Sequence, residues 1–468
     1  MSDVTRRLLA GLSGVLGALV VLTLVAATGG TRAGLPLAAA ADRQTVPGAV
    51  LPAPAPAVLP NVATSAAAPS AGVLTGLIRP LLASKALGSS ASADVLDPQT
   101  GQHLVAIGQS RILTPASTAK LLTATAALSL LGPQSTLTTR AVTGGSPEEV
   151  VLVGGGDVLL ASGRGDPATV RGRAGLDDLA AATAASLRAR GITRVTLRVD
   201  DTLFTGPAVS PAWKGTDVGH GYVAPIHAIE VDEGWQRADR RTVRATDPAL
   251  AAARQFAALL VRRGIAVSGD VARATAPAHA PTLGDVRSAS IGDLVEYALT
   301  QSDNTLAEAL ARLVAAGSNR PATFTGAGEA VIAQVASLGV PVTGAHLADG
   351  SGLSAGSGLS PAILTSVLAL AASSEHPELR PLLTGLPVAG VSGTLSDRFD
   401  QRSQRGAAGV VRAKTGTLSG VSSLAGTLVD ADGRLLVFAV MADQVGATEP
   451  ARRALDTVVS TLVRCGCR

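Results

Sequence analysis

Three short polar motifs, far apart in the chain, limit most strongly what this sequence can fold into. They are Ser117-Thr118-Ala119-Lys120, Ser302-Asp303-Asn304 and Lys414-Thr415-Gly416-Thr417, which follow one another at intervals of 185 and 112 residues. The first two lie beside segments with helical periodicity, and the third opens a segment typical of β-strands. If the motifs act together, the fold must combine helices and strands from distant parts of the chain.

The first motif places a serine and a lysine three positions apart in a predicted helix. Residues at this spacing lie on one helix face, so a neutral Lys120 amine can take the proton of Ser117 and make its Oγ nucleophilic. The helix N-terminus adds a partial positive charge and free N–H groups. Taken alone the motif is weak, because an N-cap serine followed by an unrelated lysine gives the same pattern.

Lysine is rare in this chain, and its distribution favours a chemical role for two of the motifs. The 39 basic residues include only four lysines, Lys85, Lys120, Lys214 and Lys414. A lysine can lose its proton at a desolvated site, whereas an arginine effectively cannot. Because Lys120 and Lys414 both stand in the motifs, we interpret them as functional groups and not as generic surface charge.

The other two motifs carry hydroxyl, amide and cationic groups. Ser302 can relay a proton to a leaving group, and Asn304 can hold a substrate carbonyl, although a helix N-cap explains the same residues. Lys414 followed by two threonines can grip a carboxylate, and Gly416 lets the backbone approach a ligand closely. An ordinary strand with an exposed lysine is the alternative interpretation.

The rest of the chain alternates between helical and strand-like patterns. Residues 92–108 predict two short strands around a turn at 97–101, and the C-terminal part predicts strands over about 409–442 and a helix over about 450–464. Further strand-like runs lie at 137–143, 149–153 and 192–199, and further helices near 117–131, 177–190, 248–263, 290–300, 304–316, 326–338 and 361–373. This mixture predicts an α+β or α/β chain with more than one lobe.

The N-terminal region has the pattern of an export segment. Arg6 and Arg7 precede an apolar run of 21 residues from Leu8 to Thr28, which is long enough to span a bilayer. We expect residues 1–45 to form a signal peptide, cleaved near the alanines at 38–41, or a retained membrane anchor. Residues 46–72 are rich in Pro and Ala and predict an extended linker, with the folded part starting near Val73.

Several function classes are disfavoured by composition. The net charge is only +4, long runs of Lys and Arg are missing, and aromatic residues make up 2%, which disfavours nucleic-acid binding. The six histidines are scattered, so a metal site is not expected. Cys465 and Cys467 are too few for a disulfide framework. A bridge between them would be strained, so we interpret them as free or tail-paired thiols without a catalytic role.

The three motifs in the order S-x-x-K, S-D-N, K-T-G are typical of class A β-lactamases and penicillin-binding proteins. The chain resembles the D-alanyl-D-alanine carboxypeptidase/endopeptidase family of class C low-molecular-mass penicillin-binding proteins (peptidase family S13) over roughly residues 73–464. Further stretches similar to this family are Gly154-Gly155-Gly156-Asp157, Tyr222-Val223-Ala224-Pro225, Asp349-Gly350-Ser351-Gly352-Leu353-Ser354, Leu386-Pro387-Val388-Ala389-Gly390 and Gly393-Thr394-Leu395.

The resemblance implies an α+β fold of the β-lactamase/transpeptidase type, with an antiparallel sheet flanked by helices. The long interval between Ser117 and Ser302 implies a domain inserted between the first two motifs. We therefore expect residues 73–140 and 285–468 to form the catalytic domain, and residues 141–284 to form the inserted domain.

The resemblance also implies a role for each motif residue. The expected catalytic residues are Ser117, Lys120, Ser302 and Lys414. The expected substrate-binding residues are Asn304, Thr415, Gly416 and Thr417. In this scheme Ser117 attacks the penultimate D-alanine and Lys120 accepts its proton. Ser302 and Lys414 pass a proton to the leaving D-alanine, whose carboxylate Thr415 and Thr417 hold. The N–H groups of Ser117 and Thr417 stabilise the oxyanion.

The implied activity is that of a serine-type D-Ala-D-Ala carboxypeptidase, with a further DD-endopeptidase action left open. Its implied partners are peptidoglycan stem peptides ending in D-Ala-D-Ala and the β-lactams that acylate Ser117. The resemblance implies no metal, cofactor or nucleic acid. Membrane contact is expected only through the N-terminal segment. We expect an extracytoplasmic protein that is secreted, held in the cell wall or anchored to the outer face of the cytoplasmic membrane.

Two alternatives remain open. A β-lactamase requires fast deacylation, often by a Glu on a loop between the first two motifs; we identify no such Glu, and the large insertion disfavours this interpretation. A catalytically inactive wall-binding protein on the same fold is disfavoured because all three motifs are intact.

Overall fold

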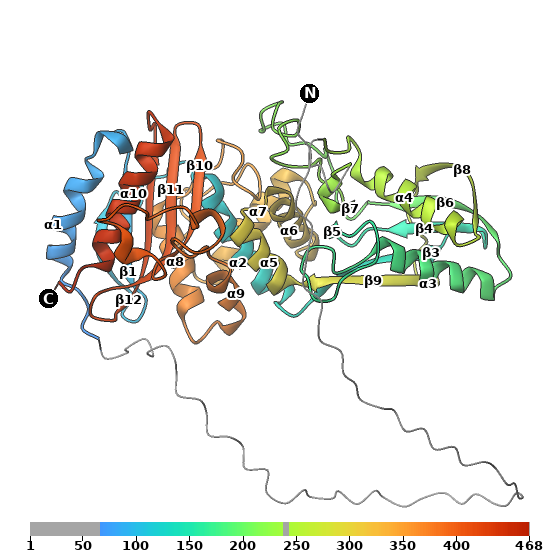
Figure 1. Ribbon diagram of the computed structural model, residues 1–468, viewed down its shortest axis with the longest axis horizontal. Coiled ribbons are helices and arrows are strands. Elements are labelled where there is room, and N and C mark those ends of the chain that lie inside the picture. Colours follow the sequence, from blue (N-terminus) through green and yellow to red (C-terminus); the bar gives the residue numbers. More distant parts are fainter. Residues whose placement is uncertain (1–65, 237–242, 468) are drawn as a thin grey trace, which may run out of the picture. The chain divides into compact units, whose positions relative to one another are not determined.

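The computed structural model describes residues 66–236 and 243–467, which belong to one compact unit (Figure 1). The predicted signal or anchor segment at 1–45 and most of the predicted linker at 46–72 lie outside the described residues. None of the helices within the described ranges is long and apolar enough to cross a membrane. The first described helix, α1, spans Ala71–Leu82 and so begins two residues before the predicted start at Val73.

The first sheet joins strands from both ends of the described chain. Its five strands are antiparallel and run in the order β10-β11-β12-β1-β2. Their bounds are Ser92–Asp97 for β1, Gln102–Ile107 for β2, Arg412–Leu418 for β10, Val421–Val429 for β11 and Leu435–Asp443 for β12. Strand β10, which carries the third motif, and strand β1 from the N-terminal part of the described chain lie in the same sheet. They are linked through β11 and β12, because β12 pairs with β1.

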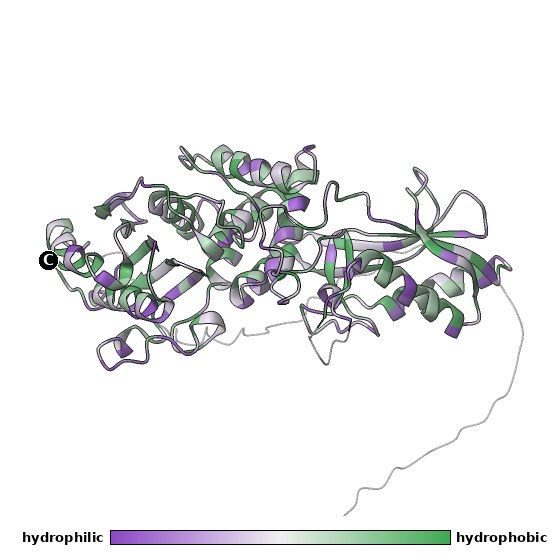
Figure 2. Cartoon of the chain, turned by 90° about the horizontal axis from the view of Figure 1, so that it is seen from above, coloured by the Kyte–Doolittle hydropathy of each residue, from purple (hydrophilic) through white to green (hydrophobic). Residues whose placement is uncertain are grey.

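Strand β12 shows why this part of the sequence is apolar without interruption. Successive side chains of a strand point to opposite faces, and both faces of β12 are covered. Phe438 and Val440 pack in one hydrophobic cluster, whereas Val437 and Ala439 pack in another. Helices α1 and α10 (Thr448–Val463) pack against one another and contact β2 and β11, and α8 (Pro361–Ala372) contacts β1 and β12. Figure 2 shows hydrophobic residues, in green, along many of the helices and strands of the chain.

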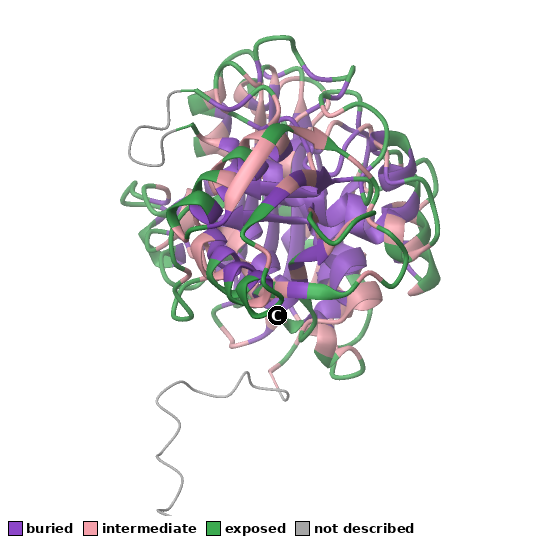
Figure 3. Cartoon of the chain, turned by 90° about the vertical axis from the view of Figure 1, so that its right-hand side faces the viewer, coloured by how far each residue is buried: buried purple, intermediate pink, exposed green. Residues whose placement is uncertain are grey.

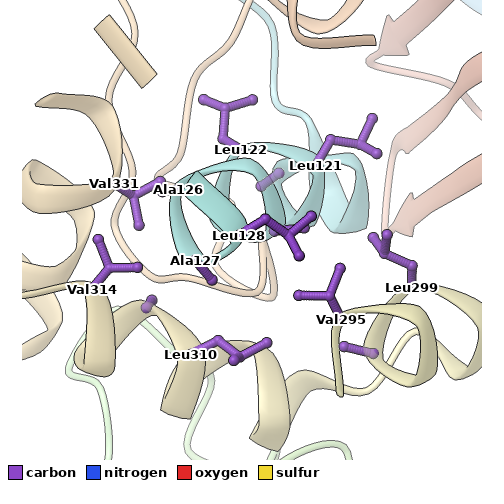
Figure 4. Close-up of a cluster of buried hydrophobic side chains, with 14 of the residues drawn as sticks. Leu121, Leu122, Ala126, Ala127, Leu128, Val295, Leu299, Leu310, Val314 and Val331 are labelled. Atoms are coloured by element: carbon purple, nitrogen blue, oxygen red, sulfur yellow. The ribbon is translucent and has the colours of Figure 1, made fainter. Parts of the chain in front are cut away.

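Helix α2, Lys120–Leu131, is the central helix of the all-helical part. Every residue from Lys120 to Leu128 is buried, including the polar Lys120, Thr123 and Thr125, so the helix is enclosed on all sides. Its leucines and alanines contact Val295 and Leu299 of α5, Leu310 and Val314 of α6, and Val331 of α7 (Figure 4). These three helices span Ile291–Gln301, Asn304–Gly317 and Phe324–Ser337. The packing fixes the start of α2, where the first motif lies.

A second five-stranded sheet has the order β8-β6-β4-β3-β9, with parallel pairs among β4, β6 and β8 and antiparallel pairs at β3. Helices α3 (Leu176–Ala189) and α4 (Pro248–Arg262) contribute to its hydrophobic core. The strands span Thr136–Thr143 (β3), Glu149–Val153 (β4), Arg194–Asp200 (β6), Ala266–Arg273 (β8) and Thr282–Ser290 (β9). A small sheet pairs β5, Asp157–Leu160, with β7, Ile229–Val231.

This architecture has the antiparallel sheet and flanking helices that the sequence predicts. Strands β8 and β9 were not predicted, because many of their positions are exposed or half-buried and polar, which weakens the alternating pattern. Figure 3 shows how burial concentrates in the interior strands and helices, with exposed residues in the loops.

Strands β3 and β9, which pair with each other, cross the predicted domain limits at 140 and 285. The division into a catalytic and an inserted domain stays a prediction.

Two smaller features complete the described chain. Helix α9 spans Arg380–Thr384. Cys465 and Cys467 are joined in a disulfide. The sequence analysis left free and paired thiols open, and the structure has the paired state. Cys465 is buried against the cluster that α1 and α10 form with the first sheet.

Candidate active site

The first motif places its serine and lysine in direct contact. Ser117 lies in a 3₁₀ turn, Ala116–Ala119, and Lys120 is the first residue of α2. The sequence predicted a continuous α-helix here, but residues three apart eclipse one another in a 3₁₀ turn, which brings them even closer. Lys120 Nζ donates to Ser117 Oγ at 3.0 Å. The nucleophile and base predicted from the sequence are therefore within hydrogen-bond distance.

Lys120 is enclosed by acceptors from two other segments. Its Nζ also donates to Asn304 Oδ1 at 2.6 Å and to the Ser351 carbonyl oxygen at 2.8 Å. A neutral amine has two N–H donors and one lone pair. If the two N–H groups face Asn304 and Ser351, the lone pair faces the Ser117 hydroxyl. This arrangement is the one that a general base for Ser117 requires.

The charge state of Lys120 is set by two opposing effects. Burial lowers the pKa of the Lys120 amine to about 8, and the nearby carboxylates of Asp349, Glu308 and Asp303 oppose that shift. The side chain is 1% exposed. Desolvation dominates because a buried ammonium loses its hydration, whereas the carboxylates only partly replace it.

The second and third motifs meet in the same way. Lys414 Nζ donates to Ser302 Oγ at 2.8 Å and to the Thr415 carbonyl oxygen at 2.9 Å. Burial lowers the pKa of the Lys414 amine well below its usual value, and the charge of Lys120 lowers it further. Each lysine therefore holds one serine, and the charge of Lys120 disfavours the charged form of Lys414.

Ser302 has an unusual backbone conformation. It is the C-cap of α5 and has a φ of 56°, in the left-handed region that costs a non-glycine residue energy. Asp303 is the residue that caps α6, by accepting from the Leu306 N–H at 3.0 Å. The helix-capping interpretation of this motif therefore applies to Asp303, and it leaves the Ser302 hydroxyl available to Lys414.

Asn304 holds two parts of the site together. Its Oδ1 accepts from Lys120, and its Nδ2 donates to the Tyr222 carbonyl oxygen at 2.9 Å. The sequence predicted an amide that binds the substrate backbone, and in this structure both ends of the amide have protein partners. Tyr222 belongs to the Tyr222-Val223-Ala224-Pro225 stretch, which the amide thereby fixes beside the first motif.

A buried glutamate that the sequence analysis missed positions the Ser351 carbonyl. Glu308 Oε2 accepts from the Gly350 N–H at 2.9 Å, and Oε1 accepts from the Ser351 N–H at 2.8 Å. Burial raises the pKa of the Glu308 carboxyl to about 7. Glu308 lies among the buried residues of α6, and a Glu within a mostly apolar helical segment is the sequence signal that points to it.

Asp349 fixes the remainder of this loop. It accepts from the Gly352 N–H at 2.8 Å, from the Ser354 N–H at 2.7 Å and from Trp213 Nε1 at 2.9 Å. Burial raises the pKa of the Asp349 carboxyl. Sequence reasoning recognised residues 349–354 by resemblance alone, and the structure shows that the loop aims a carbonyl at Lys120.

Two glycines allow the turn that carries Ser117 to fit between this loop and β10. Gly352 has a φ of +75°, and a Cβ there would lie 1.9 Å from the Ala116 carbonyl oxygen. A Cβ on Gly416 would lie 2.5 Å from the Pro115 carbonyl oxygen. Ala116 itself has a positive φ of 49°. The nucleophile is thus held in a strained turn that larger residues at either glycine would displace.

We expect Gly352→Ala to lower the rate of acylation by a β-lactam about 100-fold, because a shift of the reacting serine by about 1 Å has effects of this size. Gly191→Ala is the matched control, since Gly191 has a similar φ of +74° but open space around its Cβ position. Stopped-flow acylation and thermal melting of both variants separate displacement of Ser117 from backbone strain. Wild-type acylation by Gly352→Ala would contradict this account.

Ser117 lies where two cavities meet. The first has a volume of about 260 Å³, and Ser117, Ser302, Thr415 and Thr417 line it. The second has a volume of about 430 Å³ and extends from Ser117 and Asn304 past Tyr222 and Lys214. All predicted site residues except the buried lysines and Gly416 line one of these cavities. Ser117 is therefore reachable by a substrate that extends to both sides of the bond it attacks.

Comparison with known proteins finds a family and several relatives that match most of the chain. The model of the D-Ala-D-Ala carboxypeptidase 3 (S13) family matches residues 74–242 and 236–462. Carboxypeptidase Rv3627c of Mycobacterium tuberculosis is 39% identical over 447 residues, which covers 94% of this chain and 92% of that protein. Carboxypeptidase DacB of Mycolicibacterium smegmatis is 38% identical over 430 residues, covering 90% of this chain and 91% of the relative.

A solved structure shows the same fold. The crystal structure of penicillin binding protein 4 (dacB) from Haemophilus influenzae superposes with a TM-score of 0.68 and 23% sequence identity. The match covers 84% of this chain and 99% of that structure. The predicted fold class is confirmed by this likeness, and the predicted family by the matches in sequence. The chain belongs to the D-Ala-D-Ala carboxypeptidase 3 (S13) family.

Proposed function

We propose that this chain is a serine-type D-Ala-D-Ala carboxypeptidase that acts on peptidoglycan stem peptides through an acyl-serine intermediate. The contact between Lys120 Nζ and Ser117 Oγ at 3.0 Å, at a buried site that lowers the pKa of the Lys120 amine, carries this proposal. The relatives with the highest identities given above are named carboxypeptidases. These observations favour a nucleophilic serine with a lysine base.

The proposed acylation begins with proton transfer from Ser117 to Lys120. Ser117 Oγ then attacks the carbonyl carbon of the penultimate D-alanine, and the negative charge that develops on the carbonyl oxygen is stabilised by the N–H groups of Ser117 and Thr417. Asn304 stays bonded to Lys120 and orients the amine. In this scheme it contacts the substrate backbone through its Nδ2, which must then leave the Tyr222 carbonyl oxygen.

Departure of the leaving D-alanine requires a proton on its nitrogen. We assign this transfer to the Ser302 hydroxyl, which lines the same cavity as Ser117 and is paired with Lys414 Nζ. Ser302 gives its proton to the nitrogen and receives in return the proton that Lys120 took from Ser117, so Ser302 and Lys120 both return to their starting states. The bond between the penultimate carbonyl carbon and the nitrogen breaks, the amine leaves with its new proton, and the acyl group stays on Ser117. Water then hydrolyses this ester and restores the serine.

An intact-mass time course with benzylpenicillin, run beside a D-alanine release assay on a peptide ending in D-Ala-D-Ala, tests this function. We expect one persistent penicillin adduct per chain. With the peptide, we expect repeated turnover that releases one D-alanine for each peptide cleaved. Destruction of the antibiotic without an adduct would support a β-lactamase, and a folded protein without adduct or turnover would support an inactive wall-binding protein. A cross-linked peptide dimer in the same assay measures endopeptidase action.

The pH dependence of acylation should follow Lys120. The base must be neutral, and with a pKa of about 8 only about a tenth of the Lys120 side chains are neutral at pH 7. We expect the second-order rate constant for benzylpenicillin to rise about tenfold per pH unit below pH 8 and to level off above it. Rapid-quench mass spectrometry from pH 5.5 to 9.5 measures this profile, and a rate that falls between pH 6 and 8 would contradict a lysine base.

The proposed site of action is outside the cytoplasm. Its support is the segment in which Arg6 and Arg7 precede the apolar run Leu8–Thr28, followed by the Pro- and Ala-rich residues to position 72. We propose that this segment directs export as a cleaved signal or as a retained anchor. N-terminal sequencing of the protein recovered from intact cells and from their membranes distinguishes the two.

A further inference from the structure

The cavity beside Ser117 needs a positive charge if it is to receive a substrate that ends in a carboxylate. A buried or half-buried carboxylate is stabilised by charge-assisted hydrogen bonds, and hydroxyls alone compensate it poorly. Thr415 is one of the two hydroxyl groups expected to hold it, but Thr415 is only 9% exposed and its Oγ1 lies 2.8 Å from Thr394 Oγ1. The carboxylate therefore needs a further partner.

Lys414 is not well placed to be this partner. Its side chain is fully buried, and its Nζ is bonded to Ser302 Oγ and to the Thr415 carbonyl oxygen. Burial and the charge of Lys120 also hold the pKa of the Lys414 amine well below its usual value. The cation of the third motif is thus committed to Ser302.

Three arginines are the cations that line this cavity among the described residues, namely Arg398, Arg452 and Arg453. Arg398 is paired with Asp456, at 3.1 Å from Nε and 2.5 Å from Nη2, and its side chain is 9% exposed. Arg453 Nε donates to Glu449 Oε1 at 3.2 Å. The charges of these two arginines are therefore compensated by carboxylates of the protein.

Arg452 differs from both. Its side chain is 40% exposed, and its contact with Glu449 is 4.0 Å long. Its Nη2 approaches Thr417 Oγ1 at 3.5 Å, and its Nε is buried without a hydrogen-bond partner among the described residues. Arg452 also lines both cavities that meet at Ser117. A guanidinium with unused N–H groups thus lies beside the hydroxyl of the third motif.

We propose that Arg452 on α10 is a specificity-determining residue that binds the terminal carboxylate of the leaving D-alanine together with Thr417. A guanidinium stays charged at all working pH values and can bind a carboxylate through two parallel hydrogen bonds. Helix α10 packs against β11 of the sheet that carries the K-T-G motif, so the arginine and Thr417 keep their relative positions (Figure 1). This inference rests on the proposed carboxypeptidase function.

The test compares two peptides that differ only at the C-terminus, one ending in D-Ala-D-Ala and the other in D-Ala-D-alaninamide. The wild-type enzyme is expected to prefer the acid. In Arg452→Gln we expect kcat/KM for the acid to fall about 10- to 100-fold, because a hydrogen-bonded charge pair is lost, while kcat/KM for the amide stays within about twofold. Arg452→Lys keeps the charge but not the bidentate geometry, so its preference should be intermediate.

Arg453→Gln is the matched control, because it removes the same charge from the next position of α10 where the guanidinium is paired with Glu449. It should keep the preference for the acid, and melting temperatures should show that all variants fold. An equal loss for acid and amide in Arg452→Gln, or no loss for either, overturns the role of Arg452. If the wild-type enzyme releases neither D-alanine nor D-alaninamide, the proposed function fails first and this inference fails with it.

Discussion

Ser117→Ala is expected to lose the benzylpenicillin adduct and to lower D-alanine release at least about 10⁴-fold, because no other group replaces the nucleophile. The Ser117 hydroxyl is bonded to Lys120, and its removal leaves the buried core of α2 unchanged. We therefore expect the variant to fold and to melt within a few degrees of the wild type. Intact mass, D-alanine release and circular dichroism measure the three properties.

Ser129→Ala is the control for this variant. Ser129 lies near the other end of the same helix, where its hydroxyl donates to the Ala126 carbonyl oxygen and accepts from Gln334. This substitution should leave both the adduct and the turnover intact. A Ser117→Ala protein that still gains one penicillin per chain would show that the nucleophile is a different residue.

Replacing Lys120 should have the second-largest effect. We expect Lys120→Arg to slow acylation by benzylpenicillin about 10³- to 10⁴-fold, because an arginine keeps the positive charge but cannot give up its proton to become a base. Lys120→Met should be slowed as much, and it should lack the rise of the rate toward pH 8. Acylation rates between pH 6 and 9.5 separate a general base from a group that only contributes charge.

The stability of the Lys120 variants needs its own measurement. Lys120→Met leaves Asn304 Oδ1 and the Ser351 carbonyl oxygen without the donor that each now has, at a cost of about 1–3 kcal/mol for each acceptor that stays buried and unsatisfied. Urea denaturation detects this loss. Lys85→Met is the control, because Lys85 is exposed and should affect neither rate nor stability. Acylation by Lys120→Arg at the wild-type rate would rule out a lysine base.

The sequence predicted the site best where the interacting residues are close to one another along the chain. The serine and lysine of the first motif are three residues apart, so their contact depends on a single turn, and a helical pattern continues after them to Leu131. The sequence predicted both. It missed the 3₁₀ geometry of that turn, because the turn packs against Gly352 and Gly416, which lie more than 200 residues from it along the chain.

By itself, the sequence determined the family, the mixed α+β fold and the identity of the residues that meet in the cleft. Only the tertiary structure decided what these residues can do there. Lys120 owes its depressed pKa to burial, and its partners Asn304 of α6 and Ser351 of the 349–354 loop are 184 and 231 residues away. Arg452 likewise acquires its proposed role only through its place beside Thr417. Desolvation and hydrogen bonding depend on neighbours in space, and a one-dimensional pattern does not specify them.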